Sequence, residues 1–178
     1  MGPGSVVNGL RLAVAFLTRV PVAALRPETD LARSVPWFPV VGAAIGAATA
    51  LVFASLREAL PATVAAAVAL GFQIVITGAL HEDGLGDVAD AFGLRRPRAE
   101  VVRILEDPRL GTYGVAAISL SVVVRVASLA ALDAWGAIAA LPAAHALGRS
   151  AAVALLAVVP PAANQGLGAT YGRGVSDR

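Results

Sequence analysis

The sequence contains no cysteine and no lysine, and only 15% of its 178 residues are charged. Without cysteine, a disulfide-stapled secreted module is excluded. A soluble domain carries roughly 25% charged residues, so this chain is poor in charge. A disordered chain and a nucleic-acid-binding tail, which need more charge, are excluded. Apolar residues make up 57% of the chain, and its mean hydropathy is +0.75. These values favour an all-α, polytopic integral membrane protein that does not bind nucleic acid.

Two long runs lack charge altogether, residues 34–56 and residues 59–80. Each exceeds the roughly 20 residues that a helix needs to cross a bilayer. The short polar break between them permits a tight helical hairpin. Gly42 and Gly46 form a small-xxx-small pair, which lets helices approach closely in lipid. We therefore predict transmembrane helices over 38–56 and 60–80.

Two further spans are predicted over 113–132 and 134–159, although each is interrupted by arginine. Arg125 and Arg149 each have two possible roles: a charged side chain that faces a polar interior, or one that extends to the membrane surface from a helix end. Pro142 in the second of these segments favours a broken helix there.

The N-terminal segment is too short and too charged to span a membrane. Residues 10–20 are predicted to form an interfacial or re-entrant helix, because the segment lacks the cleavage pattern of a signal peptide. Three prolines then predict a loop or elbow before the first span, at Pro27, Pro36 and Pro39.

The arginines predict the orientation of the chain. One group precedes the first span, and a second group lies between the second and third spans, at Arg95, Arg96, Arg98, Arg103 and Arg109. Two spans separate the groups, so both lie on one side, which the positive-inside rule makes cytoplasmic. We expect a multi-pass protein of the bacterial inner membrane, with residues 81–110 as a cytoplasmic active-site segment.

Twelve of the charged residues fall within the 29 positions 81–109. Among them, Asp83, Asp87 and Asp90 are spaced i, i+4, i+7, which places them within roughly 60° of one another on a helix. Three carboxylates on one face repel one another unless a cation lies between them. Ligands that offer only oxygen suit Mg²⁺, which is commonly shared with a substrate diphosphate. The spacing predicts a Mg²⁺ site.

The alternative is a solvated acidic first turn in which Asp83 is the N-cap. The position of the cluster, directly after a membrane span, favours the metal site. Gly84 and Gly86 leave the helix face bare, so that an anion could approach the backbone. His81 is a candidate general base, a candidate metal ligand or a partner of one, or an interfacial histidine with no catalytic role.

Arginine side chains near this cluster are candidates for binding phosphate, because guanidinium binds it in a bidentate fork. Arg103 and Arg109 are the first two, and Arg149 is a third candidate for substrate binding. Gly111 and Thr112, in a Gly-Thr-Tyr-Gly turn, offer backbone N–H groups to an anion. Arg95, Arg96 and Arg98 are interpreted as charges that set the topology.

These residues resemble the motifs of one family, the cobalamin synthases (adenosylcobinamide-GDP ribazoletransferases). The family's acidic motif, H-x-D-G-L-A-D-x-x-D-G, is similar to residues 81–91, and its D-S-R-x-G-T-Y-G motif is similar to residues 107–114. Further motifs match in order, F-L-T-R-x-P at 16–21, F-P-x-x-G at 38–42, G-R-S at 148–150 and G-L-G at 166–168. The resemblance covers about residues 10–170.

The resemblance implies a phosphoryl transfer at the cytoplasmic membrane face. In it, α-ribazole or its 5′-phosphate attacks the cobinamide-linked phosphorus of adenosylcobinamide-GDP, which releases GMP and forms adenosylcobalamin or its 5′-phosphate. It assigns Mg²⁺ to the three aspartates and phosphate oxygens to Arg103 and Arg109, and it lets His81 help to deprotonate the attacking hydroxyl. The partners expected are these small molecules and membrane lipids, with a homo-oligomer left open.

The sequence departs from the family pattern at four positions, Gly86, Ala91, Pro108 and Gln165, none of which is a candidate ligand. The family continues beyond this point with further spans, so the chain is expected to be truncated at its C-terminus. Two alternatives remain: a membrane enzyme of the CDP-alcohol phosphotransferase type, and a non-enzymatic membrane subunit. The first expects an Ala-Arg pair soon after its second aspartate, and here Ala91-Phe92-Gly93 follows Asp90.

Overall fold

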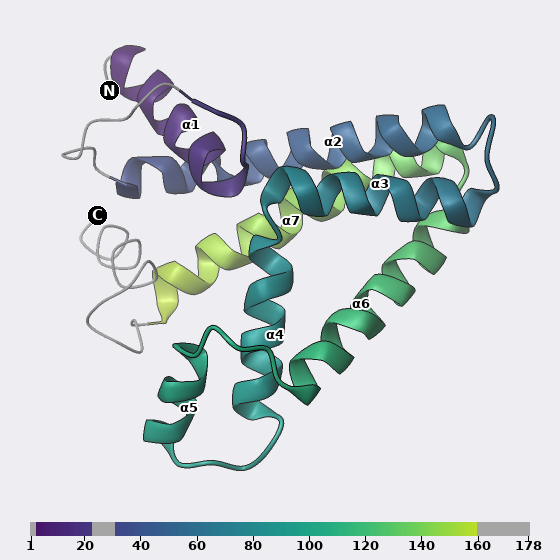
Figure 1. Ribbon diagram of the computed structural model, residues 1–178. Coiled ribbons are helices and arrows are strands. Elements are labelled where there is room, and N and C mark those ends of the chain that lie inside the picture. The colour runs from purple at the N-terminus through teal and green to yellow at the C-terminus, as the bar shows by residue number, and fades with distance from the viewer. Residues whose placement is uncertain (1–2, 23–30, 160–178) are drawn as a thin grey trace. The chain divides into compact units, whose positions relative to one another are not determined.

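The computed structural model describes residues 3–22 and 31–159, and every regular element in these two ranges is a helix (Figure 1). This confirms the all-α class. The elements are α1 (Pro3–Leu17), the 3₁₀ helix η1 (Leu31–Trp37), α2 (Phe38–Leu56), α3 (Ala62–Thr77), α4 (Leu80–Phe92), α5 (Arg98–Leu105), α6 (Thr112–Ala130) and α7 (Ala134–Val158).

Three helical stretches of the described chain are long and apolar enough to cross a membrane: Arg33–Leu56, Thr112–Ala130 and Ala134–Val158. The consecutive helices α3 and α4 form a fourth candidate only as a pair, because they are bent by 89° at the break between them. The chain is therefore a membrane protein by the length and composition of its helices, as expected.

The chain divides into two compact units, and the boundary falls within α2. Unit 1 comprises residues 1–51 and 134–178, and its described part holds α1, η1, most of α2, and α7. Unit 2 comprises residues 52–133 and holds the end of α2 and helices α3 to α6. Both contain residues of the motifs described above, and the acidic cluster belongs to unit 2.

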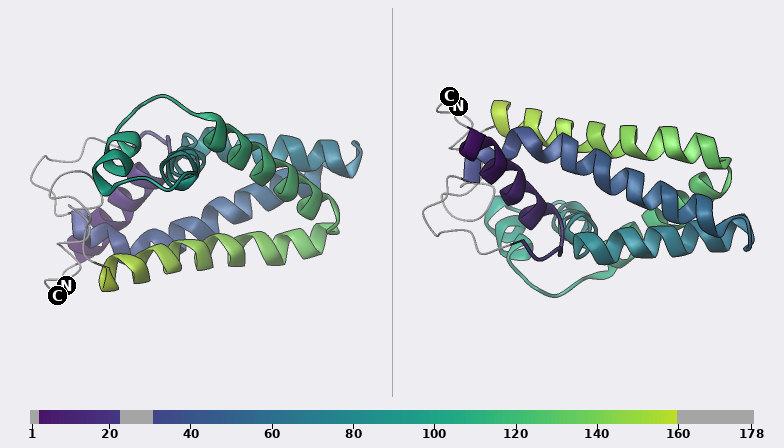
Figure 2. Two further views of the ribbon diagram at one scale, coloured as in Figure 1. Left: turned by 90° about the horizontal axis from the view of Figure 1, so that it is seen from below. Right: turned by 90° about the horizontal axis from the view of Figure 1, so that it is seen from above.

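In unit 1, α2 and α7 pack side by side through glycine (Figure 2). A methyl group on Gly42 would lie 2.7 Å from the carbonyl oxygen of His145, and one on Gly46 would collide with the carbonyl oxygen of Leu141. The predicted small-xxx-small contact is thus present. The predicted break at Pro142 is wrong, because α7 is a single helix through that residue. Membrane helices tolerate proline where neighbouring helices and local adjustments satisfy the freed backbone groups.

The N-terminal helix differs from the prediction in its bounds. It begins at Pro3 and ends at Leu17, whereas a helix over 10–20 was expected. Its Phe16 ring stacks on that of Phe38 at a centroid distance of 5.5 Å, which joins two of the sequence motifs. Of the three elbow prolines, Pro36 lies in η1 and Pro39 in the first turn of α2, where a missing N–H costs nothing; Pro27 lies outside the described residues.

In unit 2 the chain turns sharply between α3 and α4. Gly78 and Ala79 both adopt the left-handed conformation, with φ of 65° and 59°, and α3 ends at Thr77, three residues before the expected end. At the other end of α3, the side chain of Arg57 donates to the carbonyl oxygen of Leu132 and lies 5.4 Å from the Phe53 ring. This contact holds the α2–α3 turn against the end of α6.

Candidate active site at the α4–α6 pair

Helices α4 and α6 run antiparallel, and three contacts fix their register. Glu82 pairs with Arg125 at one end, Gly86 packs against the side chain of Ile118 in the middle, and Asp90 binds Gly114 at the other end. Glu82, Gly86 and Asp90 are each four residues apart, so they follow one stripe of α4. This stripe faces α6.

The ion pair between Glu82 and Arg125 is not among the contacts predicted from the sequence. The two side chains are 2.7 Å apart, and the Glu82 side chain is only 10% exposed. Its second carboxylate oxygen, Oε2, is buried and has no hydrogen-bond partner among the described residues. Of the two roles left open for Arg125, the structure shows a side chain that faces a neighbouring helix. The sequence did contain a hint of this pair, because an arginine within an apolar helix needs an acidic partner.

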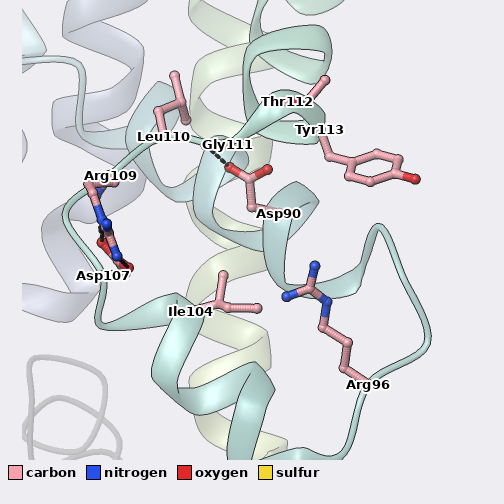
Figure 3. Close-up of a pocket in the computed structure, with 9 residues that line it drawn as sticks. All are labelled: Asp90, Arg96, Ile104, Asp107, Arg109, Leu110, Gly111, Thr112 and Tyr113. Carbon is pink, nitrogen blue, oxygen red and sulfur yellow. Dashed lines mark hydrogen bonds and ion pairs between the residues drawn. The ribbon is translucent and has the colours of Figure 1, made fainter.

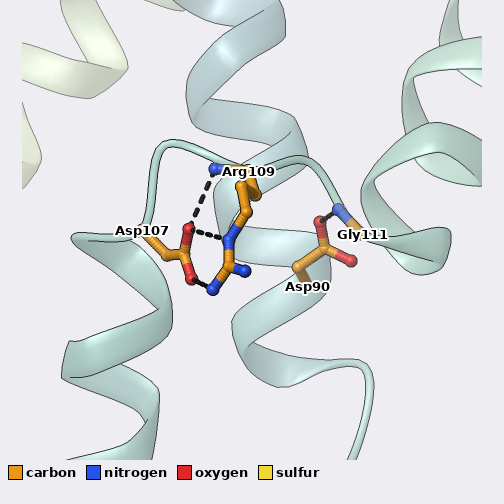
Figure 4. A network of polar contacts seen from close by, with 4 residues as sticks. All are labelled: Asp90, Asp107, Arg109 and Gly111. Atoms are coloured by element: carbon orange, nitrogen blue, oxygen red, sulfur yellow. Dashed lines mark hydrogen bonds and ion pairs between the residues drawn. The ribbon is translucent and has the colours of Figure 1, made fainter.

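Asp90 joins α4 to the turn that begins α6 (Figures 3 and 4). Its Oδ2 accepts a hydrogen bond of 2.7 Å from the backbone N–H of Gly111, and its Oδ1 accepts one of 2.9 Å from that of Gly114. The acidic motif at 81–91 and the second motif at 107–114 thus meet directly. Asp90, predicted as a metal ligand, uses both carboxylate oxygens to hold the backbone of a second helix.

Asp83 and Asp87 occupy a neighbouring stripe of α4. Asp83 is exposed and Asp87 is half-buried, and no described residue hydrogen-bonds to either carboxylate. Helices α3 and α4 qualify as a membrane span only as a bent pair, and Asp87 lies in the half of that pair that follows the corner.

The surroundings of these acids contradict two predictions, one about Asp83 and one about Gly86. The N-cap of α4 is Ala79, so Asp83 lies within the first turn and does not cap the helix. Gly84 has open space around it, but the position of Gly86 is filled by Leu110 and Ile118. Among the described residues, no three His, Cys, Asp or Glu side chains gather into a group that could hold a metal ion. A cation here would need ligands from elsewhere, such as a substrate.

Arg109 is held by its neighbour Asp107 (Figure 4). The Asp107 carboxylate accepts hydrogen bonds from Nε and Nη2 of Arg109, at 2.9 and 2.7 Å, and from its backbone N–H at 3.0 Å. The hydrogen-bonded Arg109 guanidinium lowers the pKa of Asp107 to about 2 and in turn the pKa of Arg109 is raised. This fork fixes an exposed guanidinium at the edge of the site.

An open pocket of ≈ 470 Å³ lies where these elements meet. Its lining includes Asp90, Arg109, Gly111 and Thr112, four of the residues selected from the sequence (Figure 3). It also includes residues with no predicted role in a site: Arg96, Ile104, Asp107, Leu110 and Tyr113. Arg96, interpreted as a topology charge, points its guanidinium toward this pocket and pairs with Glu100 at 3.2 Å.

The other candidates lie apart from this lining. His81 is exposed in the first turn of α4, and Arg103 is exposed in the last turn of α5. Arg149 belongs to unit 1, where it is buried on α7 beside His145 and against Gly42. The structure therefore brings Asp90, Arg109, Gly111 and Thr112 to one pocket and places Arg149 in the other unit.

Comparison with known proteins gives the family. Residues 9–178 match the family described as Cobalamin-5-phosphate synthase. Curated relatives named adenosylcobinamide-GDP ribazoletransferase include proteins of Bradyrhizobium diazoefficiens and Alkalilimnicola ehrlichii. The first is 43% identical over 94% of this chain and 66% of its own length, and the second is 46% identical over 92% and 66%.

A third relative, from Mesorhizobium japonicum, is 38% identical over 97% of this chain and 68% of its own length. The chain thus spans about two thirds of the length of these relatives. No solved structure matches it. The match over residues 9–178 confirms the resemblance that the motifs indicated: the chain belongs to the cobalamin-5-phosphate synthase family.

Proposed function

We propose that this chain carries the active-site segment of an adenosylcobinamide-GDP ribazoletransferase of a bacterial inner membrane, with residues 81–110 on the cytoplasmic side. The observation that supports it most directly is the contact between the two family motifs, in which Asp90 of the acidic motif accepts hydrogen bonds from Gly111 and Gly114 of the second. The names of the relatives support a ribazoletransferase reaction. The positive charge of Arg19 and Arg33 and of the arginines after α4 supports this orientation.

In the proposed reaction, a ribose hydroxyl of α-ribazole, or of its 5′-phosphate, attacks the cobinamide-linked phosphorus of adenosylcobinamide-GDP. The new phosphorus–oxygen bond replaces the bond to the GMP oxygen, and GMP departs with the electron pair. His81, exposed in the first turn of α4, is proposed to accept the hydroxyl proton. Positioning and electrostatic stabilisation supply most of the catalysis of such a transfer.

Basic groups around the pocket would hold the diphosphate. Arg109, fixed by Asp107, presents its guanidinium at the pocket edge, and Arg96 presents another from the loop after α4. The amino end of α6 would contribute less, because the Asp90 carboxylate already accepts the N–H groups of Gly111 and Gly114 there. Arg103 lies in the last turn of α5 and would add to the local positive charge.

The donors at Asp83 and Asp87 fit Mg²⁺, because this ion commonly takes one or two carboxylates together with substrate phosphates and water. Both carboxylates lack hydrogen-bond partners in the described chain, and their oxygens are the hard ligands that the ion prefers. When bound, Mg²⁺ would neutralise charge on the diphosphate as GMP leaves. The residues themselves would hold that cation on the open face of α4.

The test is the release of GMP from adenosylcobinamide-GDP and α-ribazole by membranes that contain the protein. We expect release to require a divalent cation and to fall at least about 100-fold in Asp83→Asn and in Asp87→Asn, because each removes a metal ligand. Glu58→Gln, an exposed acid at the α2–α3 turn, is the matched control and should retain the parental rate.

Parental rates in both aspartate variants would contradict the metal assignment. Absence of GMP release from the unmodified protein would contradict the proposed function of this chain. Release of CMP from a CDP-alcohol by the same membranes would favour the CDP-alcohol phosphotransferase alternative instead.

A further inference from the structure

The amino end of α6 depends on a side chain from another helix. Its N-cap residue is Gly111, which has no side chain that could accept a hydrogen bond from the first turn. The first four N–H groups of a helix have no partner within it. Asp90 of α4 supplies acceptors to two N–H groups there, those of Gly111 and Gly114, at 2.7 and 2.9 Å. A carboxylate at this end is also favoured by the helix dipole.

The two glycines leave just enough space for this contact. A methyl group on Gly111 would lie 2.6 Å from Oδ1 of Asp90, and one on Gly114 would collide with Oδ2. Any other residue at either position would therefore push the carboxylate away from the backbone. Glycine is therefore needed at both ends of the Gly-Thr-Tyr-Gly turn, because only glycine leaves room for the Asp90 carboxylate.

A metal ion on the same carboxylate would be poorly placed. Both oxygens of Asp90 already accept N–H groups, and the amino end of a helix carries a partial positive charge of about half an elementary charge. A divalent cation would lie next to that charge and compete with the N–H donors. Asp83 and Asp87, which have no such donors, avoid both problems.

We infer that Asp90 is a positioning residue that holds the loop bearing Arg109 and Thr112 against α4, and that it is not a ligand of the catalytic metal. The inference rests on the proposed function, in which Asp83 and Asp87 hold the cation. It predicts two roles within the acidic motif: Asp83 and Asp87 bind the metal, and Asp90 positions the loop. The contact to Gly111 and Gly114 sets where the phosphate-binding groups stand relative to the two metal ligands.

The first test compares metal binding in Asp90→Asn and Asp83→Asn. The probe is Mn²⁺ with inorganic pyrophosphate, and its binding to the purified protein is followed by electron paramagnetic resonance. We expect Asp90→Asn to retain the Mn²⁺ affinity within about twofold, while Asp83→Asn weakens it by about 10-fold or more. An Asp90→Asn variant that loses as much affinity as Asp83→Asn would overturn the inference.

The second test measures position directly, and the absence of cysteine from the chain makes it practical. Spin labels on Val88→Cys and Val115→Cys, two exposed positions on α4 and α6, report the distance between the helices near the contact. We expect a narrow distance distribution in the parental background and a broader one when Asp90→Asn is added. An unchanged distribution would contradict a positioning role.

The third test is a double-mutant cycle on GMP release with Asp90→Ala and Gly111→Ala. Each variant should lower kcat by about tenfold, and the double variant should lose little more than either, because both remove the same contact. Additive losses would overturn the inference. Gly71→Ala, whose methyl group meets nothing within 4 Å, is the matched glycine control. If the unmodified protein releases no GMP, the proposed function fails while the Mn²⁺ and distance measurements still decide the role of Asp90.

Discussion

Both compact units bring two helices together at glycines, but different atoms fill the space that the glycines leave. In unit 1, Gly42 and Gly46 of α2 admit the backbone of α7 itself. In unit 2, Gly111 and Gly114 at the start of α6 admit the Asp90 carboxylate. The first arrangement allows close packing of apolar helices. The second builds a polar junction, so similar small residues serve packing in one unit and a candidate active site in the other.

The largest effect on stability is expected from breaking the ion pair between Glu82 and Arg125 in unit 2. Arg125→Met would leave the buried Glu82 without its cation and should lower the free energy of unfolding by about 3 kcal/mol. The measurement is an SDS-induced unfolding curve in mixed micelles. The double variant Glu82→Gln, Arg125→Met removes both charges and should recover part of the loss. If the double variant is less stable than Arg125→Met, the ion pair is not the cause.

A smaller loss of stability is expected from disturbing the close packing of α2 against α7 at Gly46 in unit 1. Gly46→Ala places a methyl group against the carbonyl oxygen of Leu141, and the helices must move apart, which should cost about 1–3 kcal/mol. The same unfolding curves measure it. Gly148→Ala on α7 is the control, because its methyl group meets nothing within 4 Å. Equal stability of the two alanine variants would show that α2 and α7 do not pack through Gly46.

The smallest effect concerns pH, at the exposed edge of unit 2. The pKa of Asp107 is lowered to about 2 from its ordinary 3.8, so its pair with Arg109 is fully charged above about pH 4 and is lost as the pH falls through 2. Between pH 5 and 8, this pair should therefore add no pH dependence to activity. In Arg109→Ala the pKa of the Asp107 carboxyl should rise toward 3.8, which carbon-13 NMR of labelled aspartate measures. An unshifted pKa would mean that Arg109 does not hold Asp107.

The apolar helices were predictable because hydropathy adds up over a run of residues and needs no knowledge of the tertiary contacts. Uncharged runs longer than a bilayer, bounded by charge, predict helices irrespective of what packs on them. Helix α2 accordingly covers the predicted range, 38–56. The corner at Gly78 and Ala79 was not predictable, because a left-handed alanine is adopted only where surrounding structure imposes it. The unbroken course of α7 through Pro142 depends in the same way on its neighbours.

The candidate site was predictable in composition and less so in geometry. Helical spacing placed Asp83, Asp87 and Asp90 on one face of a helix, but spacing does not say which part of that face a partner helix covers. The contact from Asp90 to Gly111 joins residues 21 positions apart, and local patterns carry no information at that range. Arg96 was assigned to topology because its sequence neighbours are arginines, while its place in the pocket depends on the loop that follows α4.

The right-angled corner after α3 has a consequence for how charge meets lipid. Exposed apolar side chains of α4, at Leu85, Val88 and Phe92, lie on the side of the helix away from Asp83 and Asp87, at about 100° of rotation per residue. The bend of 89° turns α4 nearly perpendicular to α3. The bend therefore places one apolar face and one acidic face on a helix nearly perpendicular to α3, which is the pattern of a helix that lies in a membrane interface.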